Sequence, residues 1–280
     1  MPNDTDTIPF WKMSGAGNDF IIIDNRGGVM DGHDMAMITR KLCCRKLSVG
    51  SDGLILIEAD PDADFRWRFY NSDGGMAEMC GNGARCAARF AVLNGIAGER
   101  MVFITAAGPI EAHVTDSVVR VRMTDPSPLE SDARLSLAGG DTVAYSFINT
   151  GVPHAVVPVT DIAAVNVVDL GRRIRRHDRF SPAGTNANFI QPIGEGAVAI
   201  RTYERGVEDE TLACGTGAVA GALAASRRFG MRSPIRMKTR SGALLVIYFN
   251  DTDEGFGPVF MEGDARIIYT GKLSPEAWGY

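Results

Sequence analysis

An internal repeat constrains this chain most, because a Cys-Gly-x-Gly turn occurs twice in it. Cys80 and Cys214 are separated by 134 positions (214 − 80 = 134). Further identities recur at the same offset: Gly81 with Gly215, Gly83 with Gly217, Ala84 with Ala218, Ala88 with Ala222, Thr105 with Thr239, and Gly108 with Gly242. A constant offset held over such a length indicates two halves built on one structural plan.

The elements predicted around each turn follow the same order. A strand comes first: residues 65–71 alternate apolar and polar side chains, and residues 198–204 do so less cleanly. A polar loop, the cysteine turn and a helix follow, and the two helices are predicted to end at Asn94-Gly95 and at Gly230. Short strands that pair across Gly-containing turns are predicted to complete each half.

The second predicted helix is almost entirely small and apolar, with the sequence GAVAGALAASRRF. A helix that is apolar all round is buried. The sequence therefore predicts an α+β fold of two pseudo-symmetric lobes, in which a mostly antiparallel sheet surrounds one central helix in each lobe.

A segment rich in Pro, Gly and Asp, residues 125–141, predicts the boundary between the lobes. The last predicted strand, ARIIYTG, is expected to return and complete the first half. We therefore expect a first lobe that carries Cys80 and a second that carries Cys214, formed respectively by residues 10–126 plus 262–280 and by residues 127–261.

Composition and charge narrow the classes of partner. The formal net charge of −5 gives no reason to expect a nucleic acid or an anionic membrane. No apolar run approaches the length of a membrane span, and the first ten residues, MPNDTDTIPF, lack the regions of a secretory signal. We expect a cytoplasmic protein with a small-molecule substrate. The sequence leaves the oligomeric state open, and a homodimer is one option.

The chain has five cysteines, an odd number that does not fit a disulfide framework. Cys43 and Cys44 are adjacent in a helical pattern and are interpreted as structural. Cys-x-x-Cys spacing is absent and the four histidines are scattered, so no metal site is expected. Cys80 and Cys214 remain as the candidates for chemistry.

A thiol directly before a helix has two uses. The N-terminus of a helix presents unpaired N–H groups and the positive end of the helix dipole, which bind anions and favour thiolate over thiol. Neighbouring glycines allow the backbone to approach a ligand closely. Inversion of a stereocentre beside a carboxylate requires an acid–base group on each face of the carbon, together with N–H groups that stabilise the developing charge. Two facing Cys-Gly-x-Gly turns would supply both.

The cysteine turn has three other interpretations. A lone cysteine before a helix is commonly a small buried hydrophobe. Both segments also fit a loose Gly-x-Gly-x-x-Ala nucleotide-binding pattern, but a polar loop, not a strand, precedes each turn. A thiol redox protein that pairs Cys80 with Cys214 would lack a local Cys-x-x-Cys motif. The duplication favours catalytic cysteines, because two equivalent thiols are what a two-face reaction needs.

These motifs resemble those of the diaminopimelate epimerase family, from about residue 10 to residue 270. The similar segments are KMSGAGNDF (12–20), NSDGGMAEMCGNGARC (71–86), TGVPHAVV (150–157), NANFIQ (186–191) and ERGVEDETLACGTGA (204–218). The resemblance implies a barrel-like sheet around the central helix of each lobe. It also implies an epimerase that uses no pyridoxal phosphate or other cofactor. Such an enzyme interconverts LL- and meso-2,6-diaminopimelate, in lysine and peptidoglycan precursor biosynthesis.

The resemblance implies roles for single residues. Cys80 and Cys214 would be the two acid–base thiols, tuned by His154 and Glu204. Glu204 and Arg205 would bind the distal, non-reacting amino-acid centre, since a guanidinium fork suits a carboxylate and a Glu suits an ammonium. The other implied substrate contacts come from turn N–H groups and asparagines, at Asn18, Asn71, Gly81, Asn82, Asn186, Gly215 and Thr216.

Two positions depart from the pattern of some family members. Val152 stands where some have Asn before Pro-His, and Gly53 stands where some have Gln. Asn149 is a candidate to replace the first missing contact. The main alternative function is a related two-cysteine racemase acting on proline or hydroxyproline. That enzyme would share the two thiols and would not need a distal Glu-Arg pair.

Overall fold

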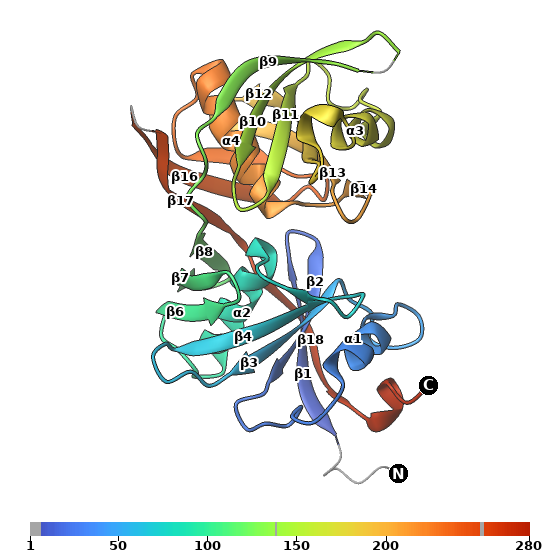
Figure 1. The fold of residues 1–280 in the computed structure, drawn as a ribbon. Helices are drawn as coiled ribbons and strands as arrows, with labels where there is room; N and C mark the ends of the chain where they lie inside the picture. Colours follow the sequence, from blue (N-terminus) through green and yellow to red (C-terminus); the bar gives the residue numbers. More distant parts are fainter. Residues whose placement is uncertain (1–6, 138, 253–254) are drawn as a thin grey trace. The chain divides into compact units, whose positions relative to one another are not determined.

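The computed structural model describes residues 7–137, 139–252 and 255–280, and the chain divides into two compact units. The first unit comprises the residues up to Val121 together with those from Asp264 onward, and the second comprises Arg122–Gly263. Helices α1 (Met35–Cys43) and α2 (Gly81–Leu93) belong to the first unit, and α3 (Val167–Arg175) and α4 (Gly215–Phe229) to the second (Figure 1).

The first unit is built on a mostly antiparallel sheet. Its strands are β1 (Ile8–Gly15), β2 (Asn18–Asp24), β3 (Gly53–Glu58), β4 (Phe65–Asn71), β5 (Met76–Ala77), β6 (Arg100–Thr105), β7 (Gly108–Thr115), β8 (Val118–Arg122) and β18 (Arg266–Leu273). Two of its pairs are parallel, β2 with β3 and β4 with β6. A helix precedes the second strand of each parallel pair, because parallel neighbours need a long crossover.

The second unit repeats this order. Its strands are β9 (Glu130–Ser136), β10 (Thr142–Asn149), β11 (Pro153–Pro158), β12 (Asn186–Gly194), β13 (Ala197–Glu204), β14 (Asp209–Thr211), β15 (Ile235–Lys238), β16 (Leu244–Thr252) and β17 (Gly255–Asp264). The parallel pairs are β11 with β12 across α3, and β13 with β15 across α4. A short 3₁₀ helix covers Asp178–Phe180 in this unit, and another covers Pro275–Ala277 in the first unit. The repeated pairings match the duplication read from the sequence.

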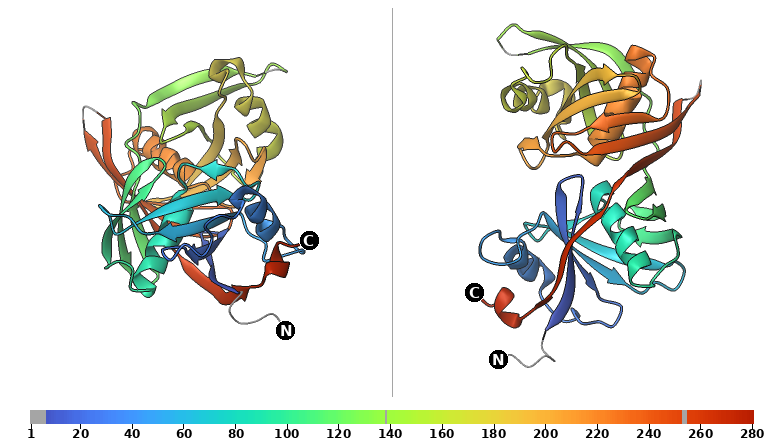
Figure 2. Two further views of the ribbon diagram at one scale, coloured as in Figure 1. Left: turned by 60° about the horizontal axis from the view of Figure 1, so that its bottom comes forward. Right: turned by 180° about the vertical axis from the view of Figure 1, so that it is seen from behind.

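One strand of the first unit comes from a distant part of the chain. β18 pairs antiparallel with β1, from Ile8 opposite Leu273 to Ser14 opposite Arg266 (Figure 2). In the second unit β9 also pairs antiparallel, but with β10, the next strand in the sequence. The last strand, β18, therefore joins the sheet of the first unit.

The central helices are buried because their side chains are small. α2 contacts β1, β2, β3 and β7, and its Ala84, Ala87, Ala88 and Ala91 are fully buried. α4 contacts strands from β9 to β16 and ends at Gly230, whose φ of 65° is the left-handed conformation that glycine adopts easily. Both helix ends fall where the sequence predicted them. The α+β fold class is confirmed: each unit is a mostly antiparallel sheet around a central helix.

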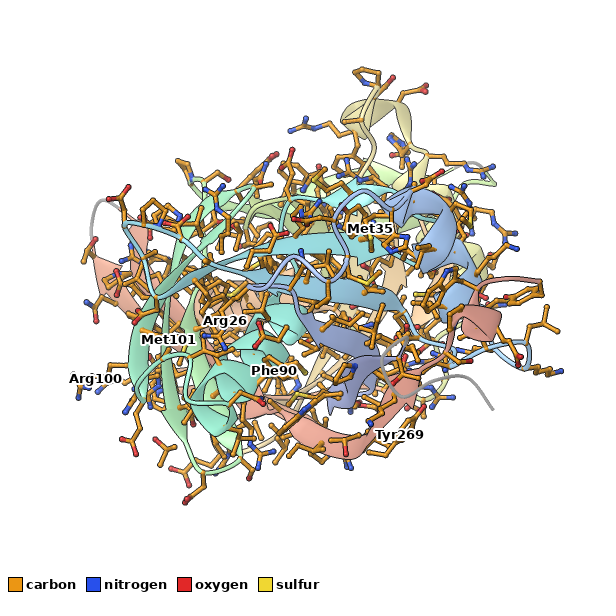
Figure 3. All side chains as sticks on the ribbon, turned by 90° about the horizontal axis from the view of Figure 1, so that it is seen from below. Arg26, Met35, Phe90, Arg100, Met101 and Tyr269 are labelled. Carbon is orange, nitrogen blue, oxygen red and sulfur yellow. The ribbon has the colours of Figure 1, made fainter. Side chains whose placement is uncertain are left out.

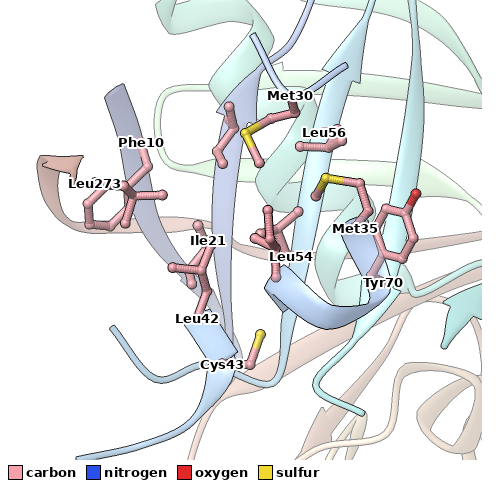
Figure 4. Packing of buried hydrophobic residues seen from close by; sticks show 12 residues of the cluster. Phe10, Ile21, Met30, Met35, Leu42, Cys43, Leu54, Leu56, Tyr70 and Leu273 are labelled. Atoms are coloured by element: carbon pink, nitrogen blue, oxygen red, sulfur yellow. The ribbon is translucent and has the colours of Figure 1, made fainter. Parts of the chain in front are cut away.

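A second helix covers the other face of strands β2 and β3. Met35, Leu42 and Cys43 of α1 pack on Ile21 and Leu54, in a cluster that Leu273 of β18 joins (Figure 4). Alternate residues of the same strands face α2, so both faces are covered. This is why the middle of each strand is a continuous apolar run, FIII in β2 and LILI in β3, and does not alternate as in a sheet with one face in water.

Strands at the surface show that alternation. Along β6 the exposed Arg100 precedes the buried Met101, and the pattern continues to the end of the strand (Figure 3). α2 lies behind this sheet with its Phe90 buried and in edge-on contact with the ring of Trp11. One face of β6 is thus turned to solvent, while its buried residues lie on the inner face of the sheet.

Candidate active site

Each of the two cysteines caps a central helix. Cys80 precedes α2 and Cys214 precedes α4, both in extended backbone conformation with φ/ψ of −145°/115° and −119°/116°. The first N–H groups of a helix have no partner within the helix and carry a partial positive charge. Both sulfurs therefore lie where a thiolate is favoured. We call Cys80, Gly81, Asn82 and the nearby Asn18 the Cys80 half-site.

The Cys214 half-site consists of Cys214, Gly215 and Thr216, with the residues behind them. The Cys214 Sγ accepts a hydrogen bond from the Gly217 N–H at 3.4 Å and lies 3.5 Å from the Thr216 hydroxyl. The Thr150 hydroxyl donates to the Thr216 carbonyl at 3.0 Å, which ties the turn to the loop after β10. A fixed donor on sulfur favours the thiolate form.

Gly217 is required by the side chain packed against the turn. A Cβ added there would lie 2.5 Å from the Asn188 Oδ1 and 3.2 Å from the Cys214 Sγ. Asn188 is fully buried on β12 and accepts a hydrogen bond from the Thr202 hydroxyl at 3.0 Å. The glycine thus allows a polar side chain to approach the backbone directly behind the cysteine.

His154 is the next residue in this buried polar network. It has no exposed surface, and Asn188 Nδ2 lies 3.1 Å from its Nδ1. An amide N–H can only donate, so Nδ1 accepts and the imidazole proton is on Nε2. Among the described residues Nε2 has no hydrogen-bond partner. Burial, reinforced by the charge of Arg205, lowers the pKa of His154 to about 3, so the ring is neutral at physiological pH.

The predicted distal residues lie at the end of β13 (Glu204) and at the start of the turn that follows it (Arg205). Glu204 accepts a hydrogen bond from the Thr211 hydroxyl at 2.8 Å, and Arg205 Nη1 donates to the Ala183 carbonyl at 3.2 Å. Asn186 is buried: its Oδ1 accepts from the Arg205 N–H at 2.8 Å and its Nδ2 donates to the Pro153 carbonyl at 3.1 Å. The structure therefore gives Asn186 a part in holding Arg205 and the strand start that carries His154.

The Cys80 half-site is organised around Asn18. Its Oδ1 accepts from the Cys80 thiol at 3.6 Å and from Asn82 Nδ2 at 3.4 Å, while its Nδ2 donates to an Asp52 carboxylate oxygen at 2.6 Å. The carboxylate can only accept, so Asp52 orients the Asn18 amide with its oxygen toward the thiol. The Asp52 carboxylate also accepts the Asp19 N–H at 3.0 Å.

Other predicted contacts lie apart from these networks. Asn71 is exposed at the end of β4, opposite Gly53. A Cβ at Gly53 would lie 2.5 Å from the Phe69 ring and 2.7 Å from the Tyr70 carbonyl oxygen, so the packing leaves no room there for a larger residue. Asn149 caps its own loop, with its Oδ1 accepting from the Gly151 N–H at 2.9 Å.

Sequence reasoning missed three residues of these networks: Asp52, Arg85 and Asn188. A signal existed for two of them. Arg85 is a charged residue in an otherwise small and apolar stretch of α2, and its side chain is fully buried. Asn188 is two residues from Asn186 on one strand, so both side chains face the same side. Asp52 carried no such signal, because an Asp beside a loop glycine is usually part of a turn.

The remaining cysteines differ from the two caps. Cys86 is fully buried within α2, and burial raises the pKa of its thiol to about 12. Burial raises the pKa of Cys43 to about 11 even though its sulfur lies 3.0 Å from the Ser51 hydroxyl. All five cysteines are free thiols.

Two further features of the described part of the chain bear on other kinds of function. No group of three or more His, Cys, Asp or Glu side chains there could hold a metal ion. Among the described helices, none combines the length and the apolar character needed to cross a membrane.

Solved structures with the same fold include enzymes that act on small molecules. A phenazine biosynthesis protein of the PhzF family from Bacillus anthracis superposes with a TM-score of 0.71 at 16% identity, over 95% of this chain and 99% of that one. A hydroxyproline epimerase from Agrobacterium vitis superposes with a TM-score of 0.69 at 17% identity, over 99% and 96%. At such identities the likeness shows the fold alone.

The sequence comparisons are more specific. The family description "Diaminopimelate epimerase" matches residues 10–129 and 146–268. A diaminopimelate epimerase of Aquifex aeolicus (strain VF5) is 45% identical over 98% of this chain and 100% of its own length, and one of Chlorobaculum tepidum is 43% identical over 94% and 100%. Two cysteine turns at equivalent helix starts, in a chain matched over almost its whole length, give one conclusion: the chain belongs to the diaminopimelate epimerase family.

Proposed function

We propose that this protein is an epimerase that interconverts LL- and meso-2,6-diaminopimelate by moving one proton between two thiols across an α-carbon. The observation that carries the proposal is the placement of Cys80 and Cys214 at equivalent N-caps of two repeated units. One of these thiols, as thiolate, removes the α-proton from one face. The other, as thiol, returns a proton to the opposite face, and the two exchange roles in the reverse direction.

The helix N-termini stabilise the charge that develops during the reaction. Loss of the α-proton moves negative charge onto the adjacent carboxylate, and preorganised N–H donors aimed at that charge lower the barrier. We assign this task to the turn N–H groups of Gly81, Asn82, Gly215 and Thr216. The chemistry proposed for these residues needs no cofactor, because the base, the acid and the anion site all come from the chain.

The substrate's second amino-acid centre distinguishes it from simple amino acids. We assign its carboxylate to Arg205 and its ammonium to Glu204, which are adjacent where β13 ends and the next turn begins. The hydrogen bond from the Arg205 N–H to Asn186 supports this assignment, because it fixes the backbone from which the guanidinium extends. Asn18 and Asn71 are assigned to the substrate's polar groups, and the neutral ring of His154, with Glu204, to tuning of the thiols.

Deuterium exchange in D₂O tests the function. The reduced protein is incubated with LL-diaminopimelate, and the stereoisomers and the deuterium at the α-carbon are followed by chromatography and mass spectrometry. We expect the meso isomer to form with solvent deuterium at its inverted centre. Absence of both exchange and inversion in a folded, reduced sample would contradict the proposal.

Proline in place of diaminopimelate tests the alternative function. A proline or hydroxyproline racemase would use the same two thiols, and the hydroxyproline epimerase that shares this fold makes the comparison direct. Proline has no distal centre for Arg205 to bind, so we expect it to be a poor substrate. Equal rates on proline and diaminopimelate would overturn the substrate assignment and leave the two-thiol mechanism in place.

Assembly and location stay predictions. A homodimer is an option that size-exclusion chromatography with light scattering would decide, and a cytoplasmic location is one that cell fractionation would decide.

A further inference from the structure

The Cys80 half-site has a buried cation behind it. Arg85 is fully buried, one turn into α2, and its hydrogen bonds include three to neutral oxygens. Its Nη1 donates to the Gly81 carbonyl at 3.3 Å, its Nη2 to Asn82 Oδ1 at 3.0 Å and its Nε to the Asp264 carbonyl at 3.3 Å. Two of the three acceptors belong to the turn that follows the candidate catalytic cysteine.

The packing holds this side chain in place. Gly15, at the end of β1, lies against it: a Cβ added to Gly15 would lie 3.2 Å from Arg85 Nη2 and 3.1 Å from the Asn82 carbonyl oxygen. The guanidinium is packed against backbone and donates two hydrogen bonds to the same turn, so it has little freedom to move. It therefore fixes the Asn82 amide, whose Nδ2 in turn donates to Asn18.

The charge of Arg85 acts on the thiols near it. Burial lowers the pKa of the guanidinium, while Cys86, Cys80 and Asp264 act to raise it. An arginine nevertheless keeps its proton in proteins. Cys86 is held neutral by burial, with its pKa raised to about 12. The groups left to carry a negative charge near this guanidinium are therefore the Asp264 carboxylate, at the end of β17, and the thiolate of Cys80, at the start of α2.

The second unit places a different residue at this point. Arg85 plus the repeat offset of 134 gives position 219 (85 + 134 = 219), where a buried valine stands. The Cys214 half-site is instead backed by Asn188 and the neutral His154.

We propose that Arg85 is the positioning residue of the Cys80 half-site: its buried guanidinium fixes the first turn of α2 and supplies a permanent positive charge that favours the Cys80 thiolate. This inference rests on the proposed two-thiol function. The other ionisable groups near the turn are Cys86 on α2, Asp264 at the end of β17, and the cluster beside Asn18 formed by Lys12, Asp19, Arg45 and Asp52.

Alkylation of each thiol as a function of pH tests the proposal without turnover. Iodoacetamide is used on the full chain, and the Cys80 and Cys214 peptides are quantified separately by mass spectrometry. In Arg85→Met we expect the apparent pKa of Cys80 to rise by about one unit, because an opposite charge nearby lowers a pKa by roughly 1–3 units. Cys214 should not change. The alkylation profiles can be measured even if the native protein does not epimerise diaminopimelate. Failure of the proposed function and failure of the Arg85 proposal are therefore distinguishable.

Two further variants complete the test. Arg89→Met removes a cation one turn further along α2, whose Nε donates to the Asp116 carbonyl, and should leave both profiles unchanged. Arg85→Lys keeps the charge and loses the fork, so we expect a Cys80 profile within half a unit of native with a lower kcat. A folded Arg85→Met with native Cys80 reactivity would overturn the proposal. If Arg85→Met does not fold, Arg85→Lys provides the test. A shift of the apparent pKa of Cys80 accompanied by an equal shift for Cys214 would overturn the proposal.

Discussion

The Cys80 and Cys214 half-sites share a backbone and differ in their surroundings. Both cysteines cap a buried helix in nearly the same extended conformation. The Cys214 sulfur accepts a backbone N–H, whereas the Cys80 thiol donates to Asn18. The two units therefore share the helix N-terminus that stabilises an anion, and they differ in the groups that contact each sulfur.

The neighbours show what has diverged. Behind Cys80 lies a buried arginine, and behind Cys214 a neutral buried histidine held by Asn188. A charge in a buried site acts strongly on a nearby thiol, while a neutral ring acts through its single N–H. The two thiols are thus expected to have different intrinsic acidities, although each helix offers the same dipole.

Removal of either sulfur has the largest expected effect. Cys80→Ala and Cys214→Ala should each lower kcat for epimerisation by about 10²–10⁴-fold, the usual contribution of an acid–base group. Cys86→Ala is the matched control from the same helix, because its thiol is buried and neutral. Deuterium incorporation from D₂O measures all three. A Cys86 variant that lost activity while Cys214→Ala kept it would contradict the comparison.

Arg205→Met should have the next largest effect. The first unit has no equivalent arginine, because the position 134 residues earlier is Asn71. A charged hydrogen bond lost from a buried site costs roughly 1.5–3 kcal/mol, so kcat/KM on diaminopimelate should fall by at least about tenfold. Arg175→Met is a control on a neighbouring arginine that pairs with Glu208 at 3.0 Å. Steady-state kinetics decide the matter, and equal losses in both variants would argue against a specific role for Arg205.

The buried His154 predicts a dependence of stability on pH. The folded state binds a proton on this ring only near pH 3, and the unfolded state binds one near pH 6.5. As the pH falls below 6.5 the unfolded state takes up more protons, so the histidine lowers the free energy of unfolding progressively toward pH 3. By pH 5.5 this amounts to about 1.4 kcal/mol.

His154→Gln removes the titrating group and tests this effect. Urea unfolding at pH 7.5 and at pH 5.5 should show a smaller drop in the variant than in the native protein. His113→Gln, at a half-buried position on β7, is the control and should keep the native drop. Identical pH dependence in the native protein and His154→Gln would show that the ring is not buried neutral.

The smallest expected effect is at the residues that follow the first turn glycine. Asn82 and Thr216 occupy equivalent positions in the repeat, and only Thr216 places a hydroxyl near its own cysteine, at 3.5 Å. Thr216→Val should slow alkylation of Cys214 about threefold at neutral pH, since hydrogen bonds to sulfur are weak, and leave Cys80 unaffected. Thr216→Ser keeps the hydroxyl and should react like the native protein.

Much of this organisation could be predicted from residues alone. The offset of 134 between the two cysteine turns indicated repeated units, and small side chains in GAVAGALAASRRF indicated a buried helix. Asn94-Gly95 and Gly230 marked the helix ends. These predictions hold because they rest on local chemistry: small residues permit close packing, and a left-handed cap needs glycine. Which polar side chains contact one another was not predictable. Asn18 and Asp52, for example, are brought together only by the pairing of β2 with β3.

The sequence by itself determined the repeat, the α+β class and the two thiols at helix starts, because these depend on spacing and on side-chain size. The tertiary structure decided what surrounds each thiol. Tertiary packing buries Arg85 near the Cys80 turn and His154 near the Cys214 turn. Burial excludes the water that would otherwise screen the electrostatic effect of each side chain. The sequence gives the identity of the ionisable residues, whereas the fold determines how deeply each is buried and therefore the effective dielectric around it.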